Sequence, residues 1–278
     1  MRRGLLLLLA LALALALALA LPGCAESAPR QAATTTTTST TAAPPGPVRV
    51  LVYSATFGYR HPSIATGVQR FAALGDGPEF DVRHTEDPAA ITAAALADVD
   101  VLVWLNGTGE HPFTDEQRAG LSSWLRGGGG LVGIHAAADA NYQWPDYAGM
   151  IGRVFRAHPH TGEAVNVVTD PANPLVAHLP VRFALNEEYY AFRPEPQVPV
   201  HVLTALDETT AGAQAADYGP ASPTTWCHEV GQGRAFYTAW GHMDATFADD
   251  AVWQMLVQAL RWTGGRLQAD CSARPAGP

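Results

Sequence analysis

The stretch GGGGLVGIHAAAD, residues 127–139, decides the fold. Its glycines end a predicted helix that begins at the capping sequence Thr114-Asp115-Glu116-Gln117. The apolar run at 131–134 then predicts a strand buried on both faces, and His135 follows at the point where that strand ends. A helix followed closely by a buried strand is typical of α/β proteins, whose strands lie parallel.

The same alternation continues in both directions along the chain. Short apolar runs predict earlier strands at 48–53, 80–84 and 99–105, with a helix from Ser63 to about Leu74. After about Val154, strand patterns predominate, at 164–169, 200–206, 224–230 and 234–239, before a closing helix over about 249–263. We therefore predict one α/β domain over 48–265, with a doubly wound (flavodoxin-like), mainly parallel sheet, an antiparallel extension and a tail over 266–278.

The charge composition excludes several functions. The 17 basic residues are all arginine, because the sequence contains no lysine, and 26 acidic residues give a formal charge of −9. A nucleic-acid-binding protein needs clustered cations against phosphate, so we expect no nucleic-acid partner. Chemistry that depends on lysine, such as Schiff-base formation, is also excluded.

The first 47 residues indicate export. Arg2 and Arg3 precede an apolar run over 5–21, so residues 1–24 are predicted to be a signal peptide. The segment Leu21-Pro22-Gly23-Cys24 resembles a bacterial lipobox, which implies lipidation of Cys24; an uncleaved anchor and simple secretion are the alternatives. Residues 25–47, rich in Thr, Ala and Pro, are predicted to be a linker. We expect a cell-surface protein that touches the membrane only through this lipid or anchor.

Two further cysteines, Cys227 and Cys271, lie in a predicted strand and in the tail. An oxidising compartment would allow them to form a disulfide, which would tie the tail to the domain. Two free thiols are the alternative, since spacing alone shows no geometry.

Polar residues gather at the predicted strand ends, whereas the strands themselves are apolar. In open α/β sheets, ligands bind at the carboxyl ends of the strands. The candidate residues there and in the connecting region are Tyr59, Arg60, His61, Asn106, His135, His158, His160, Glu188, His242 and Asp244. Each also has an ordinary interpretation, because a histidine at a strand end often binds a backbone carbonyl and Glu187-Glu188 is typical of a solvated acidic surface.

Several of these motifs, in order, resemble the ThuA-like (trehalose utilisation) family of the class I glutamine amidotransferase-like superfamily. They are 57–61, 127–137, His158-Pro159-His160 and 231–242, and the resemblance covers about 48–264. Amidotransferases of that superfamily expose a cysteine in a Gly-x-Cys-x-Gly turn. Here Gly133-Ile134-His135 places histidine at that position, so we expect no glutamine amidotransferase activity.

The resemblance implies a small sugar or glycoside as the ligand, since relatives are associated with keto-sugars. The leading hypothesis is acid–base catalysis of hydrolysis, elimination or isomerisation by His135, His242, Glu188 and Asp244. Substrate would be bound by Tyr59, Arg60, His61, Asn106 and His160. No cofactor is assigned, but a divalent metal held by His135, His160, Glu188 and His242 is an alternative. A carbohydrate-binding lipoprotein without catalysis is a further alternative.

Overall fold

The computed structural model describes residues 46–194, 198–212, 217–218 and 222–273. The predicted signal peptide, Cys24 and nearly all of the linker lie outside these residues. Within the described part of the chain, no helix has the length and apolar character needed to cross a membrane.

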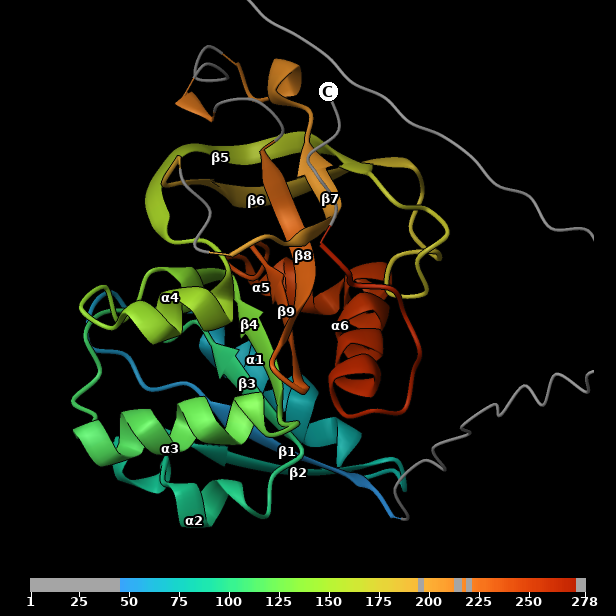
Figure 1. Ribbon diagram of the computed structural model, residues 1–278. Helices are drawn as coiled ribbons and strands as arrows, with labels where there is room; N and C mark the ends of the chain where they lie inside the picture. The colour runs from blue at the N-terminus through green and yellow to red at the C-terminus, as the bar shows by residue number, and fades with distance from the viewer. Residues whose placement is uncertain (1–45, 195–197, 213–216, 219–221, 274–278) are drawn as a thin grey trace, which may run out of the picture. The chain divides into compact units, whose positions relative to one another are not determined.

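One nine-stranded sheet in these residues has the order β2-β1-β3-β4-β9-β8-β7-β5-β6 (Figure 1). Five strands form its parallel half: β1 (Val48–Tyr53), β2 (Phe80–Thr85), β3 (Val101–Leu105), β4 (Gly130–Ile134) and β9 (Gly233–Thr238). Four strands form the antiparallel extension: β5 (Phe155–Val168), β6 (Arg182–Phe192), β7 (His201–Leu206) and β8 (Pro223–Val230). The predicted α/β class with an antiparallel extension is confirmed.

Helices pack on both faces of the parallel half. The alternation of side chains along β1 sends Val50 to one hydrophobic cluster and Leu51 to another. The first cluster contains residues of α1 (Ile64–Leu74), α5 (Asp244–Ala248) and α6 (Asp250–Thr263). The second contains residues of α2 (Ala93–Leu96), α3 (Asp115–Arg126) and α4 (Pro145–Ile151). The central strands β3 and β4 are therefore apolar and buried throughout, whereas the edge strand β2 is largely polar and exposed.

The predicted capping sequence does begin a helix. Thr114 accepts a hydrogen bond from the backbone of Gln117, whose side chain accepts one from the backbone of Thr114. At the other end of α3, a Cβ on Gly129 would lie 2.5 Å from the Trp124 ring. The glycine run therefore lets the chain pass close to Trp124 before it enters β4.

The antiparallel half differs from the sequence prediction. Strand β5 begins at Phe155 rather than near Ala164, and β6 was not predicted at all. The acidic pair Glu187-Glu188 lies in the middle of β6 and interrupts the apolar pattern by which a strand is recognised. These two strands pair from Phe155↔Phe192 to Val167↔Arg182, with register shifts on either side of Ala157.

Cys227 and Cys271 form a disulfide, with an S–S distance of 1.98 Å. Cys227 lies in β8, and both cysteines are buried in the first hydrophobic cluster. The bond therefore attaches the segment that follows α6 to the interior of the sheet.

Candidate metal centre

His135 directly follows β4 and is held in an unusual backbone conformation. Its φ is +47°, in the left-handed region, and its side chain is completely buried. The ring Nδ1 lies 2.6 Å from the carbonyl oxygen of Ala239. A carbonyl can only accept a hydrogen bond, so Nδ1 carries the proton and Nε2 keeps a free lone pair. This lone pair is available to a metal or a substrate.

Two other histidines reach the same point from distant segments. His61 lies in the loop between β1 and α1, and His242 lies in the loop after β9. The ring centroids of His61 lie 4.8 Å from His135 and 5.2 Å from His242, and those of His135 and His242 lie 5.3 Å apart. The buried atoms His61 Nδ1, His135 Nε2 and His242 Nδ1 make no hydrogen bond of normal geometry.

Glu188 of β6 supplies a carboxylate to these rings. Its Oε2 lies 3.4 Å from His135 Nε2 and 3.3 Å from His242 Nδ1. One donor atom from each of His61, His135, Glu188 and His242 lies within 4.8 Å of all the others. We call these four residues the histidine–glutamate cluster.

The charges within the cluster are strongly coupled. Burial alone would raise the pKa of the Glu188 carboxyl, but contacts with His135 and His242 outweigh it and hold that pKa well below its ordinary value. Contact with Glu188 raises the pKa of His242. Burial, together with repulsion from the other two rings, lowers the pKa of His61 to about 3, so this ring is neutral at physiological pH. A neutral imidazole is the form that binds metals.

Glu187 positions the loop that carries His242. It is completely buried, and its carboxylate accepts hydrogen bonds from Gly241 N at 2.9 Å, His242 N at 3.1 Å and the Thr246 hydroxyl. The same carboxylate also accepts one from Glu188 N at 3.1 Å. The sequence offered no signal for this role, because the interpretation of Glu187 as a solvated acid fits an acidic pair equally well.

A cavity of about 290 Å³ opens beside the cluster. It is lined by Tyr59, His61, Asp139, Phe155, His158, Glu188, Tyr190 and His242. Burial raises the pKa of Asp139, which accepts a hydrogen bond from the Tyr142 hydroxyl at 2.5 Å. His158 lies with its Nδ1 3.5 Å from Glu188 Oε1. The cavity therefore offers a second carboxyl group, aromatic walls and a face of the cluster.

The structure brings some predicted site residues together and separates others. His135, Glu188 and His242 lie in the cluster, and His61, predicted to bind substrate, lies there as well. His160 lies outside it, with Nε2 3.2 Å from the carbonyl oxygen of Glu163 and its ring stacked on Tyr189. Strand β5 shifts its register between residues 157 and 160, and His158, two residues before His160, contacts Glu188 instead.

Three more predicted residues have other contacts. Asp244 begins α5 and accepts a hydrogen bond from the Thr66 hydroxyl at 2.6 Å. Arg60 is exposed and pairs with Glu86 at 2.6 Å, while Tyr59 lines the cavity.

Asn106 is fully buried and joins three segments of the chain. Its Nδ2 donates to Ser63 Oγ at 3.1 Å and to the Gly241 carbonyl at 3.0 Å, and its Oδ1 accepts from Ala136 N at 3.3 Å. It thereby fixes the loops that carry His61, His135 and His242 relative to one another.

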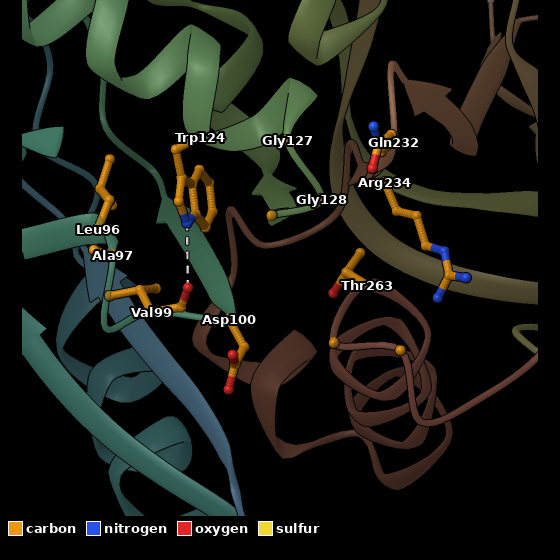
Figure 2. Close-up of a pocket in the computed structure, with 13 residues that line it drawn as sticks. Leu96, Ala97, Val99, Asp100, Trp124, Gly127, Gly128, Gln232, Arg234 and Thr263 are labelled. Atoms are coloured by element: carbon orange, nitrogen blue, oxygen red, sulfur yellow. Dashed lines mark hydrogen bonds between the residues drawn. The ribbon is translucent and has the colours of Figure 1, made fainter. Parts of the chain in front are cut away.

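A larger cavity, of about 390 Å³, lies at the opposite ends of the parallel strands (Figure 2). Three of its polar side chains, Trp124, Arg234 and Asp100, already have partners within the protein. Trp124 Nε1 donates to the Val99 carbonyl at 3.2 Å, and Arg234 donates to the Trp262 carbonyl at 2.7 Å. Asp100 pairs with Arg49 at 2.7 Å. We therefore place the functional site at the histidine–glutamate cluster.

These features define an α/β protein that gathers three imidazoles and one carboxylate at the carboxyl ends of its parallel strands. Residues 49–263 match the ThuA family, described as trehalose utilisation, and the chain belongs to this family. No curated protein sequence matches the chain.

Two solved structures are similar along most of their length. A putative ThuA-like protein from Bacteroides uniformis is 26% identical with a TM-score of 0.66, over 79% of this chain and 93% of that protein. A putative ThuA-like protein from Parabacteroides merdae is 18% identical with a TM-score of 0.64, over 82% of this chain and 98% of that protein, which shows a shared fold.

Proposed function

We propose that this protein is a metal-dependent enzyme that acts on a glycoside or keto-sugar. The observation that carries the proposal is the convergence of three buried, unbonded imidazole nitrogens on one carboxylate. A bound cation would satisfy all three nitrogens and the carboxylate at one point, whereas the contacts within the protein leave each of these nitrogens without a hydrogen bond of normal geometry.

The donor atoms suit a divalent ion such as Zn²⁺. Three imidazole nitrogens and a carboxylate oxygen are borderline donors, typical of zinc and neighbouring transition metals. Two ligands that each lie 2.0–2.1 Å from a tetrahedral ion are separated by about 3.4 Å. Glu188 Oε2 lies 3.4 Å from His135 and 3.3 Å from His242. The bond from His135 Nδ1 to the Ala239 carbonyl is the kind of support that ligating histidines commonly have.

A divalent ion held by His61, His135, Glu188 and His242 would supply a Lewis acid, provided that it accepts a carbonyl or hydroxyl oxygen of the substrate as a further ligand. Asp139 can exchange a proton with the substrate, because burial raises the pKa of its carboxyl above the ordinary value and Tyr142 orients that carboxyl. The exposed ring of Tyr59 and the ring of Phe155 can pack on the apolar face of a sugar. In this proposal His135, Glu188 and His242 are ligands rather than the acid and base that the sequence suggested.

The family description supports a carbohydrate as the substrate. The apolar run after Arg2 and Arg3, together with Cys24, supports a location outside the cytoplasmic membrane, held by a lipid. Strand order and two-sided helix packing support a doubly wound, flavodoxin-like arrangement of the parallel half.

The test combines metal analysis with turnover. The full chain is stripped with a chelator, reloaded with Zn²⁺, Mn²⁺ or Co²⁺, and incubated with disaccharides and their keto derivatives. We expect one ion per chain and metal-dependent turnover, both lost in His135→Ala and kept in His160→Ala. A thermal shift with a sugar but no product would support the non-catalytic carbohydrate-binding protein instead. Failure of every ion to bind stoichiometrically would overturn the proposal.

A further inference from the structure

A second cavity, of about 530 Å³, adjoins the site and is rich in arginine. Arg153, Arg156 and Arg193 line it, and we call it the arginine cavity. Tyr190 lines both this cavity and the one beside the histidine–glutamate cluster. A third cavity shares Phe155 and His158 with the site and Arg156 with the arginine cavity. The arginines are therefore next to the proposed reaction centre.

These arginines lack the acidic partners that seven of the other ten described arginines have. Within the described residues, no carboxylate lies within 4.0 Å of Arg153, Arg156 or Arg193, whereas the same part of the chain contains eight arginine–carboxylate pairs. Arg156 donates instead to the backbone carbonyl of Asp217. In a chain with a formal charge of −9, a cavity lined by three arginines and the single acidic residue Asp217 carries a local excess of positive charge.

Arg153 is the most informative of the three. Its Nε is buried without a hydrogen-bond partner, and burial lowers the pKa of its guanidinium. A cation taken out of water costs free energy unless an anion or hydrogen bonds compensate it. Among the described residues, Asp217 is the acidic residue that lines the cavity, and no described carboxylate lies within 4.0 Å of Arg153, so an anionic ligand would compensate this cation.

Aromatic rings hold two of the guanidinium groups in place. Arg153 lies over the Trp226 ring at 6.0 Å, and Arg193 lies over the Tyr142 ring at 5.0 Å. Tyr142 in turn donates its hydroxyl hydrogen to Asp139, which lines the site. The arginines are thus positioned before any ligand binds, which lowers the entropic cost of binding one.

We propose that the arginine cavity binds the anionic group, a carboxylate or a phosphate, of an acidic sugar whose reacting carbons reach the histidine–glutamate cluster. Arginine recognises both groups through paired, charge-assisted hydrogen bonds. A volume of about 530 Å³ is in the range of small-molecule sites and accommodates a monosaccharide unit. The inference rests on the proposed function for the reaction centre, and it narrows the substrate from sugars in general to acidic sugars.

The test measures binding to the chelator-treated full chain, so that it does not depend on the metal. Isothermal titration at low salt compares glucuronate, glucose 6-phosphate, glucose and inorganic phosphate. We expect at least one acidic sugar to bind tenfold or more tightly than glucose, and Arg156→Gln and Arg193→Gln each to weaken that binding about tenfold. Arg126→Gln, whose parent pairs with Asp146 away from the cavity, is the matched control and should bind as the unmodified protein does.

The outcomes separate the two proposals. Equal affinity for glucose and both acidic sugars, or unchanged binding in both arginine variants, would overturn the arginine cavity while leaving the metal centre standing. Tighter binding of glucuronate would identify a carboxylate as the group recognised, and tighter binding of glucose 6-phosphate a phosphate. Inorganic phosphate that binds as tightly as either sugar would show a free anion site instead and contradict the acidic-sugar proposal. Unfolding curves in urea verify that each variant is folded.

Discussion

Replacement of Glu187 by glutamine tests whether this carboxylate, which is not itself one of the proposed ligands, positions the loop that carries the proposed ligand His242. Its two oxygens accept four hydrogen bonds, from Gly241 N, His242 N, Glu188 N and the Thr246 hydroxyl. Glutamine has only one acceptor oxygen. In the orientation that loses fewer hydrogen bonds, the glutamine NH₂ takes the place of the oxygen that faces Thr246 and Gly241. The Thr246 hydroxyl can rotate to accept a hydrogen bond from this NH₂. The N–H of Gly241 can only donate and is left without an acceptor.

The magnitude follows from that count. One buried N–H left without an acceptor costs about 1–3 kcal/mol, and the remaining bonds lose their charge assistance. We expect Glu187→Gln to lower the free energy of unfolding by about 2–4 kcal/mol. Because the loop that carries His242 loses a bond, we also expect Zn²⁺ affinity to fall roughly 10–100-fold, the range typical of groups that support metal ligands.

Urea unfolding followed by circular dichroism gives the stability, and competition with a chromophoric chelator gives the metal affinity. Glu229→Gln makes the same chemical change at an exposed position of β8 and is the control. A Glu187→Gln protein within 0.5 kcal/mol of the unmodified protein, with unchanged Zn²⁺ affinity, would refute the role assigned to this carboxylate.

Three further predictions concern the metal, acid and the disulfide. Zn²⁺ at a hundred times its Kd should raise the free energy of unfolding by about 2.7 kcal/mol in calorimetry, an effect abolished by His135→Ala and kept by His160→Ala; loss in both variants would contradict the cluster. Burial lowers the pKa of His228 to about 4, so near pH 6.5 this histidine binds a proton in the unfolded chain but not in the folded protein. The free energy of unfolding should therefore fall by about 2–3 kcal/mol between pH 7 and 4.5 because of this residue. Urea unfolding of His228→Gln should show a smaller fall over the same pH range, and an equal fall would contradict the prediction. Alanine at both Cys227 and Cys271, which are 44 residues apart, should cost about 3–4 kcal/mol in urea unfolding, and an equally stable variant would show that the bond restricts the unfolded chain very little.

The parallel half of the fold could be predicted from the sequence because its signals are local. Strands β3 and β4 are uninterrupted apolar runs, and the capping sequence before Asp115 predicts the start of α3. The antiparallel half could be predicted only in outline. In β6 the first residues alternate in exposure and the rest are buried, and its central acidic pair is buried only because distant loops supply donors. No property of residues 182–192 alone carries that information.

The candidate site shows the same limit. Strand-end position was enough to select His135 and His242, because parallel strands bring their carboxyl ends to one edge, whereas Glu188 was selected from the connecting region. It was not enough to choose between His61 and His160 as the remaining metal ligand. That choice depends on the register of β5 and on the direction of a loop, and both are set by tertiary packing.

Glu188 enters the metal cluster from the antiparallel half of the sheet, whereas His61 and His135 enter from the parallel half. An ion bound by all four residues would cross-link the two halves of the sheet, and its ligands would range from position 61 to position 242 of the chain. Binding by all four residues requires that both halves of the sheet have docked, because only Glu188 comes from the antiparallel half. Hydrogen exchange at β5 and β6 would then slow when the metal binds, because occupancy of the metal centre would stabilise the sheet against local opening.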